Sequence, residues 1–105
     1  MPDMHDITIT FNNLDEHLTE DEREEITHLI TNFCLKISRQ DEIERIELSS
    51  NEQKNHTGEI SVFQITAQLF FHSGEKLVAH AGGREVEPAI REALKRLEAQ
   101  ERKKH

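Results

Sequence analysis

The sequence predicts an α+β fold in which strands and helices follow in the order β-α-β-β-β-α. Four segments alternate apolar and polar residues with the period of two that is typical of a half-buried strand. Two other segments repeat apolar residues with the helical period of 3.6. Two amphipathic helices can bury their apolar stripes by packing on the same face of a sheet. We therefore expect both helices on one face of a four-stranded sheet, with the other face exposed to solvent.

The first half of the chain contains one expected strand and one expected helix. Residues 6–11 alternate as a strand, and Asn12 and Asn13 are expected to mark a turn or loop. Thr19 and Glu22 have the spacing of a capping box, so a helix is expected over 20–38. Its apolar stripe consists of Ile26, Leu29, Ile30, Phe33 and Ile37, and Leu35 lies away from it.

The second half contains three expected strands and the closing helix. Strands are predicted over 43–50, 60–71 and 76–81, with a flexible polar loop over 51–59. Ser73-Gly74 supplies a tight turn, and Gly82-Gly83 is expected to end the last strand. The final helix has Pro88 in its first turn, where proline is tolerated, and its buried stripe consists of Val86, Ile90, Ala93, Leu94 and Leu97.

Length and composition indicate one domain, residues 1–105, with an aliphatic core. Cys34 is the single cysteine and falls in a helical apolar pattern, so we expect a reduced core thiol and not a nucleophile. No apolar run approaches the roughly 20 residues of a membrane span, and the first residues do not resemble a signal peptide. These features favour a cytoplasmic protein.

Charge is distributed unevenly along the chain. Residues 1–75 carry a net charge of −11, from 5 Lys and Arg against 16 Asp and Glu. Residues 76–105 carry +3, from 8 against 5, within a total of −8. The total argues against a general nucleic-acid binder, but the basic closing segment could present one positive face.

The basic residues of the closing segment form a row opposite its apolar stripe. Arg84, Arg91, Lys95 and Arg102 fall within roughly 40° of one another at 3.6 residues per turn. Such a row can follow a phosphate backbone. Glutamates stand four residues before Arg91, Arg96 and Arg102, which also stabilises a solvated helix. On the residues alone the solvated face is the better explanation, because charge runs are usually solvated.

No residue pattern in the chain indicates catalysis or a resident metal. The seven histidines lack the close spacings of known metal motifs, and His72 and His80 flank one hairpin without a third ligand. No nucleophile elbow or phosphate-binding glycine loop is present. We therefore expect a protein that is not an enzyme and has no cofactor and no metal site.

The closing segment GEKLVAHAGGREVEPAIREALKRLEAQERKKH resembles the ribosome hibernation promoting factor and ribosome-associated inhibitor family, also called sigma-54 modulation proteins. The hairpin matches the family pattern at Gly74, Leu77, Ala79, Ala81 and Gly83, and the helix matches it at Ala89, Ile90, Leu94, Leu97 and Gln100. The opening DITITFNNLDEHLTEDEREEI resembles the family's first strand, loop and helix start. The family's fold has the same β-α-β-β-β-α order.

The resemblance implies a short-form stress factor that binds ribosomal RNA of the small ribosomal subunit and blocks translation. The expected partner is that subunit, with no membrane or DNA contact, and we expect a monomer. The expected RNA-binding residues are Lys76, Arg84, Arg91, Lys95, Arg102, Lys103 and Lys104.

The alternative is an acidic protein-interaction module of the same fold that has lost ribosome binding. The family typically carries lysines late in its first helix, where this chain has only Lys36 and Arg39. Glu85, Glu87, Pro88 and Arg91 depart from the family pattern at the start of the second helix. A basic partner would then meet the acidic stretch at residues 20–25.

Overall fold

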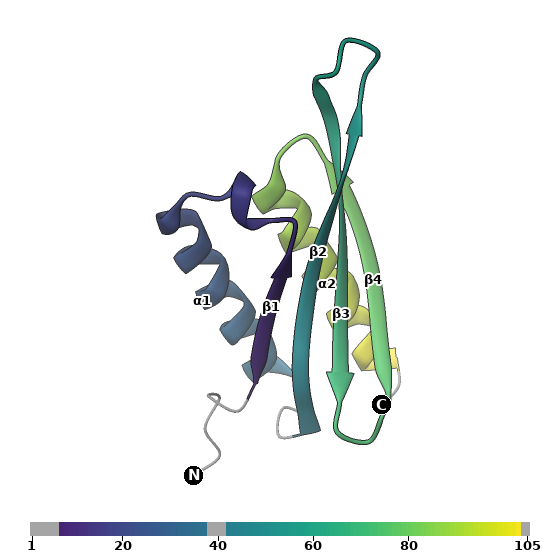
Figure 1. Cartoon of the computed structure of the whole chain (residues 1–105). Helices are drawn as coiled ribbons and strands as arrows, with labels where there is room; N and C mark the ends of the chain where they lie inside the picture. Colours follow the sequence, from purple (N-terminus) through teal and green to yellow (C-terminus); the bar gives the residue numbers. More distant parts are fainter. Residues whose placement is uncertain (1–6, 38–41, 104–105) are drawn as a thin grey trace.

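The computed structural model describes residues 7–37 and 42–103. Its elements are β1 (Thr8–Asn12), the 3-10 turn η2 (Asp15–His17), α1 (Glu20–Lys36), β2 (Ile43–Lys54), β3 (Ile60–Phe71), β4 (Lys76–Gly83) and α2 (Val86–Lys103). The sheet has the order β1-β2-β3-β4, with β1 parallel to β2 and the other neighbours antiparallel. In Figure 1, α2 lies behind the sheet and α1 lies beside its β1 edge, and the predicted fold is confirmed.

The core lies between the sheet and the two helices, and its composition follows the predicted stripes. Ile26, Ile30 and Phe33 of α1 are buried, as are Ile90 and Leu97 of α2. The sheet contributes the alternating inner residues Ile46, Leu48, Ile65, Ala67, Leu69, Phe71, Leu77, Ala79 and Ala81. Each fully buried Leu, Ile or Phe side chain of this core contributes roughly 1.5–3 kcal/mol by leaving water.

Helix α1 begins where the capping box predicts. The amide of Glu22 donates to Oγ1 of Thr19 at 3.1 Å, and the amide of Thr19 donates to Oε1 of Glu22 at 3.0 Å. The helix ends at Lys36, slightly before the predicted end. Leu35 is 49% exposed, which confirms that it lies off the stripe.

Three boundaries in the sheet differ from the sequence prediction. Strand β1 includes Asn12, which pairs with Ser49 of β2 where a turn or loop was predicted. Strand β2 runs four residues beyond the predicted end, because Asn51 and Glu52 pair with β3 opposite Gln64 and Phe63. The predicted flexible loop over 51–59 is therefore wrong in its first part. The chain turns only over 55–59, where Oδ1 of Asn55 accepts hydrogen bonds from the amides of Thr57 and Glu59. The extended β2–β3 hairpin projects beyond the helices (Figure 1).

Strand β4 also runs further than predicted. Gly82 and Gly83 pair with Gln64 and Phe63 of β3, so they continue the strand and do not end it. Helix α2 starts at Val86, three positions after Gly83, which places Arg84 before the helix and not on its face. No helix within residues 7–37 and 42–103 combines the length and the apolarity that crossing a bilayer requires.

Candidate functional site

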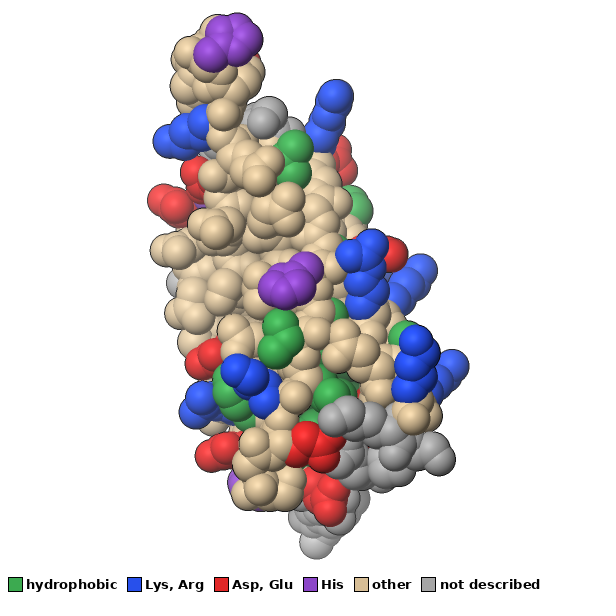
Figure 2. All heavy atoms as spheres, turned by 90° about the vertical axis from the view of Figure 1, so that its right-hand side faces the viewer, with side chains coloured by type: hydrophobic (Ala, Val, Ile, Leu, Met, Phe, Trp, Pro, Cys, Tyr) green, Lys and Arg blue, Asp and Glu red, His purple; other side chains and the backbone are tan. Residues whose placement is uncertain are grey.

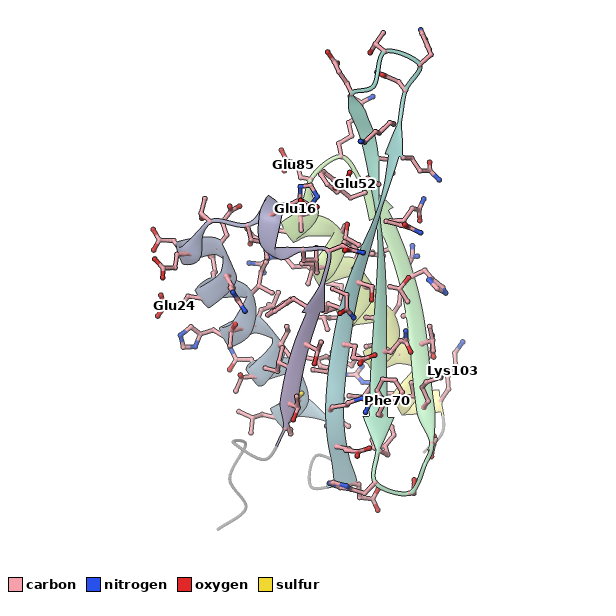
Figure 3. The ribbon with its side chains drawn as sticks, in the orientation of Figure 1. Glu16, Glu24, Glu52, Phe70, Glu85 and Lys103 are labelled. Atoms are coloured by element: carbon pink, nitrogen blue, oxygen red, sulfur yellow. The ribbon has the colours of Figure 1, made fainter. Side chains whose placement is uncertain are left out.

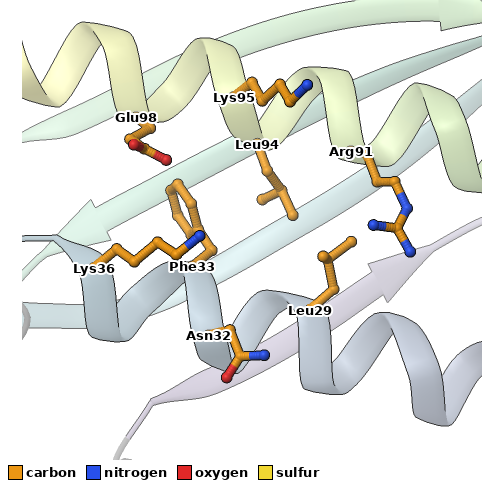
Figure 4. Close-up of a pocket in the computed structure, with 8 residues that line it drawn as sticks. All are labelled: Leu29, Asn32, Phe33, Lys36, Arg91, Leu94, Lys95 and Glu98. Carbon is orange, nitrogen blue, oxygen red and sulfur yellow. The ribbon is translucent and has the colours of Figure 1, made fainter.

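A groove of about 320 Å³ runs between the exposed flanks of α1 and α2. Leu29 and Phe33 of α1 and Leu94 of α2 form its apolar floor, because the two buried stripes meet there (Figure 4). Polar and charged side chains at its margin are Asn32 and Lys36 from α1, and Arg91, Lys95 and Glu98 from α2. The groove therefore combines an apolar base with three cationic side chains supplied by both helices.

The arginines of α2 are paired with its own glutamates. Arg91 donates to Oε1 of Glu87 through Nε at 3.1 Å and through Nη2 at 2.8 Å. Nη2 of Arg102 lies 2.7 Å from Oε1 of Glu98. These pairs are exposed and stabilise the helix by about 0.3–0.5 kcal/mol each. Part of the basic row is thus neutralised locally, as the i,i+4 spacing predicts.

Lysines carry the unpaired positive charge of the groove. Lys36 and Lys95 are exposed and have no carboxylate within ion-pair distance among the described residues. They come from different helices, 59 positions apart in the sequence. Since an ammonium group without an internal carboxylate partner has no ion pair to give up when an external anion binds, these two lysines are the most available anion ligands of the groove.

The remaining predicted RNA-binding residues lie on separate parts of the surface. Lys76 is on the outer sheet face, with Nζ 5.8 Å from the centre of the Phe70 ring, which Arg45 also covers at 4.1 Å. Arg84 lines a shallow recess before α2, and Lys103 is exposed at its end. Lys104 lies outside the described residues, as does Arg39. Figure 2 shows Lys and Arg side chains along the margin formed by α2.

Sequence patterns missed two features of this surface. Lys36 was recognised as a basic residue of α1, but nothing in the chain order indicated that it meets Lys95 across one groove. Arg96 donates to the main-chain carbonyl of His80 on β4, so it holds the helix to the sheet and is not part of a free basic row. Gln100, four positions after Arg96, makes a similar bond to the carbonyl of Val78. This spacing of four is the sequence feature that could have indicated a shared contact with β4.

The single cysteine of the chain, Cys34, does not line this groove. Cys34 is buried in the core, and burial raises the pKa of its thiol to about 12, so the thiolate that a nucleophile needs is disfavoured at neutral pH. The residues that could hold a metal, Glu16, His17 and Glu52, lie elsewhere, at the base of the β2–β3 hairpin. The groove can bind anions and a flat apolar surface.

Comparison with known proteins gives structural neighbours only. No protein-family model matches the sequence, and no curated protein sequence is significantly similar to it. A solved ribosomal subunit interface protein from Coxiella burnetii superimposes with a TM-score of 0.65 at 20% identity, over 93% of this chain and 94% of that one. The Protein Y N-terminal domain of Thermus thermophilus superimposes with a TM-score of 0.58 at 14% identity, over 93% and 96%.

Both neighbours are matched over nearly their whole length, so the likeness covers the complete arrangement of sheet and helices. Identities of 20% and 14% establish a shared fold. The family resemblance of the closing segment is thereby confirmed at the level of the fold: the chain has the β-α-β-β-β-α fold of the ribosomal subunit interface protein and of the Protein Y N-terminal domain.

Proposed function

We propose that this chain is a ribosome-associated hibernation factor that binds the small ribosomal subunit and blocks translation. The shared fold supports ribosome association, because one of the two structural neighbours is a ribosomal subunit interface protein. The small subunit, the block of translation and a role in stress are the finer parts of the proposal. Ribosomal RNA would be bound through phosphates, without catalysis.

The observation that carries the proposal is the convergence of Lys36 and Lys95 on one groove between two helices. Exposed cations flanking a groove can follow the phosphates of an RNA strand, while the apolar floor provides contact area. Arg91 adds a planar guanidinium, which suits forked contacts to phosphate oxygens. The net charge of −8 restricts such binding to this side, because the acidic remainder of the chain repels RNA.

The decisive experiment is co-sedimentation of the purified chain with purified small ribosomal subunits at low salt. The double variant Lys36→Glu, Lys95→Glu should weaken binding by at least about tenfold, since the salt-dependent attraction of two phosphates becomes repulsion. Lys54→Glu on the hairpin is the control, because Lys54 is exposed and does not line the groove. Absence of binding at low salt, or equal loss in the control, would overturn the proposal.

A second candidate function is an acidic protein-interaction module. It is favoured by the exposed acids Glu20, Asp21, Glu24 and Glu25 at the start of α1, together with the neutralised arginines of α2. Its partner would be a basic protein. Affinity capture with the immobilised chain would then recover one basic protein without ribosomal RNA, and replacing these four acids by glutamine and asparagine would abolish the capture.

A further inference from the structure

Three potential metal ligands from two distant segments meet at the base of the β2–β3 hairpin. Glu16 and His17 belong to η2, and Glu52 lies on β2, 35 residues after His17. One ligand atom from each residue lies within 4.8 Å of the other two. Figure 3 labels Glu16 and Glu52 close to each other below the projecting hairpin, in the upper half of the view, whereas Lys103 lies in the lower half. The cluster is separate from the groove between α1 and α2.

One imidazole nitrogen of the cluster faces two carboxylates. Nε2 of His17 lies 3.5 Å from Oε1 of Glu16 and is in direct contact with Oε1 of Glu52. Tetrahedral Zn²⁺ with bonds of about 2.0–2.1 Å spaces adjacent ligand atoms about 3.3 Å apart. The separation from Glu16 is therefore close to that of two ligands of one ion, whereas the contact between His17 and Glu52 is shorter and has to open to admit the ion.

The core of the protein fixes two of the three ligands. The His17 ring packs edge-on against Phe63, with ring centres 5.0 Å apart and an angle of 70°. Phe63 is the ladder partner of Glu52, so the same strand pair positions both ligands. The amide of His17 donates to the carbonyl of the fully buried Leu14 at 2.9 Å, which anchors η2. Only Glu16 is widely exposed, with 71% of its side chain accessible.

A buried hydroxyl beside the cluster provides a second, independent observation. Ser50 precedes Glu52 by two residues on β2 and therefore shares its face. Its Oγ atom is buried, at 5% exposure for the residue, and has no hydrogen-bond partner among the described residues. Ser50, Glu16 and Glu52 line one recess of about 290 Å³. A buried polar atom without a partner is costly, and a water molecule bound to an ion in this recess would satisfy it.

We propose that Glu16, His17 and Glu52 bind one Zn²⁺ ion, with a water in the fourth position that is hydrogen-bonded to Ser50. One imidazole with two carboxylates is a ligand set that suits Zn²⁺, whereas Mg²⁺ and Ca²⁺ prefer oxygen ligands alone. The ion ties η2 to the base of the hairpin. Because binding requires the folded arrangement of segments 35 residues apart, it stabilises the fold and fixes the direction of the hairpin.

The test is titration of the metal-free full-length chain with zinc chloride, followed by calorimetry and by amide nuclear magnetic resonance. One Zn²⁺ should bind per chain, and the signals that change should be concentrated at Glu16, His17, Ser50, Glu52 and Phe63. With zinc at about 100 times its Kd, the melting temperature should rise by about 10 °C. Magnesium chloride at the same concentration should change neither the amide signals nor the melting temperature.

Three variants separate this site from the other histidines. Glu16→Gln changes an exposed side chain, so the fold should be retained. Zinc affinity should fall at least about tenfold, because losing even a residue that hydrogen-bonds to a metal ligand costs that much. His17→Gln should abolish the specific spectral changes. His28→Gln is the matched control, because His28 is exposed on α1 and lies outside the cluster. The zinc affinity of this variant should equal that of the wild type.

Three outcomes would overturn the zinc site. The first is no binding at millimolar zinc, and the second is spectral change confined to His28, His56, His72 or His80. The third is a Glu16→Gln variant that binds as tightly as the wild type. Ribosome co-sedimentation is not part of this test, so the zinc site and the proposed function can fail independently.

Discussion

The side chain of Gln100 donates a hydrogen bond of 2.7 Å to the main-chain carbonyl of Val78 and so joins α2 to β4. Arg96, one turn earlier, donates to the carbonyl of His80, two residues along the strand. Four helical residues span about 6 Å and two strand residues span nearly the same distance, so the spacing of the two donors on α2 matches the spacing of the two acceptors on β4. They occupy acceptors on an edge strand that could otherwise pair with another chain.

Replacing Gln100 by methionine should lower the free energy of unfolding by about 1 kcal/mol, because the shape is kept while the hydrogen bond to Val78 is lost. Chemical denaturation measures the difference. Lys103→Met on the same helix is the control, since Lys103 is exposed and should change stability by less than about 0.5 kcal/mol. A Gln100→Met variant as stable as the wild type would show that the bond contributes nothing.

Replacing Thr19 by alanine should cost about 1 kcal/mol of stability, because the amide of Glu22 loses its acceptor and the reciprocal bond loses its support. Thr27→Ala within the same helix is the control. The hydroxyl of Thr27 donates only to the carbonyl of Arg23, and that carbonyl already accepts a main-chain hydrogen bond within the helix. The Thr27→Ala variant should therefore be neutral or slightly more stable. Thermal unfolding of both variants checks this, and equal losses would contradict the capping interpretation.

The thiol of Cys34 should make the protein less stable at alkaline pH. Burial raises its pKa from 9.0 to about 12, so above pH 9 the unfolded chain ionises while the folded chain does not. The stabilising contribution is therefore complete below pH 9 and is lost as the pH rises toward 12. Between pH 9 and 10, the wild type should lose about 1 kcal/mol relative to Cys34→Ala. Parallel pH profiles for the two proteins would exclude this linkage.

Removing the carboxylates that neutralise α2 should strengthen ribosome binding. In the double variant Glu87→Gln, Glu98→Gln, the guanidinium groups of Arg91 and Arg102 lose their internal partners and become available to phosphates. The slope of log affinity against log salt should become steeper by about 1–2, one unit for each added phosphate contact. Co-sedimentation over a salt series measures the slope.

The same double variant should be less stable by only about 0.6–1 kcal/mol, because each exposed i,i+4 pair contributes little. Glu92→Gln is the control for lost negative charge, since Glu92 neutralises Arg96, whose guanidinium also bonds to His80. If Glu92→Gln steepens the slope as much as the double variant does, net charge and not the freed arginines would explain the gain. An unchanged slope in the double variant would count against a phosphate-binding role for α2.

The sequence by itself determined the order of the elements, the start of α1 and the composition of the core. These features depend on local periodicity and on contacts within a few residues. Thr19 and Glu22 are three positions apart, and Leu77, Ala79 and Ala81 follow the strand period. The closing segment also indicated a family whose fold the structural neighbours share.

Only the tertiary structure decided the ends of β2 and β4, and the two clusters proposed as binding sites. Pairing with β3 extends both strands into residues whose own pattern predicts loops and turns. Packing of α1 against α2 brings Lys36 to Lys95, and sheet register brings Glu52 to His17. These encounters join residues 35 or more positions apart, and their geometry depends on register and helix packing, which no local pattern in the chain encodes.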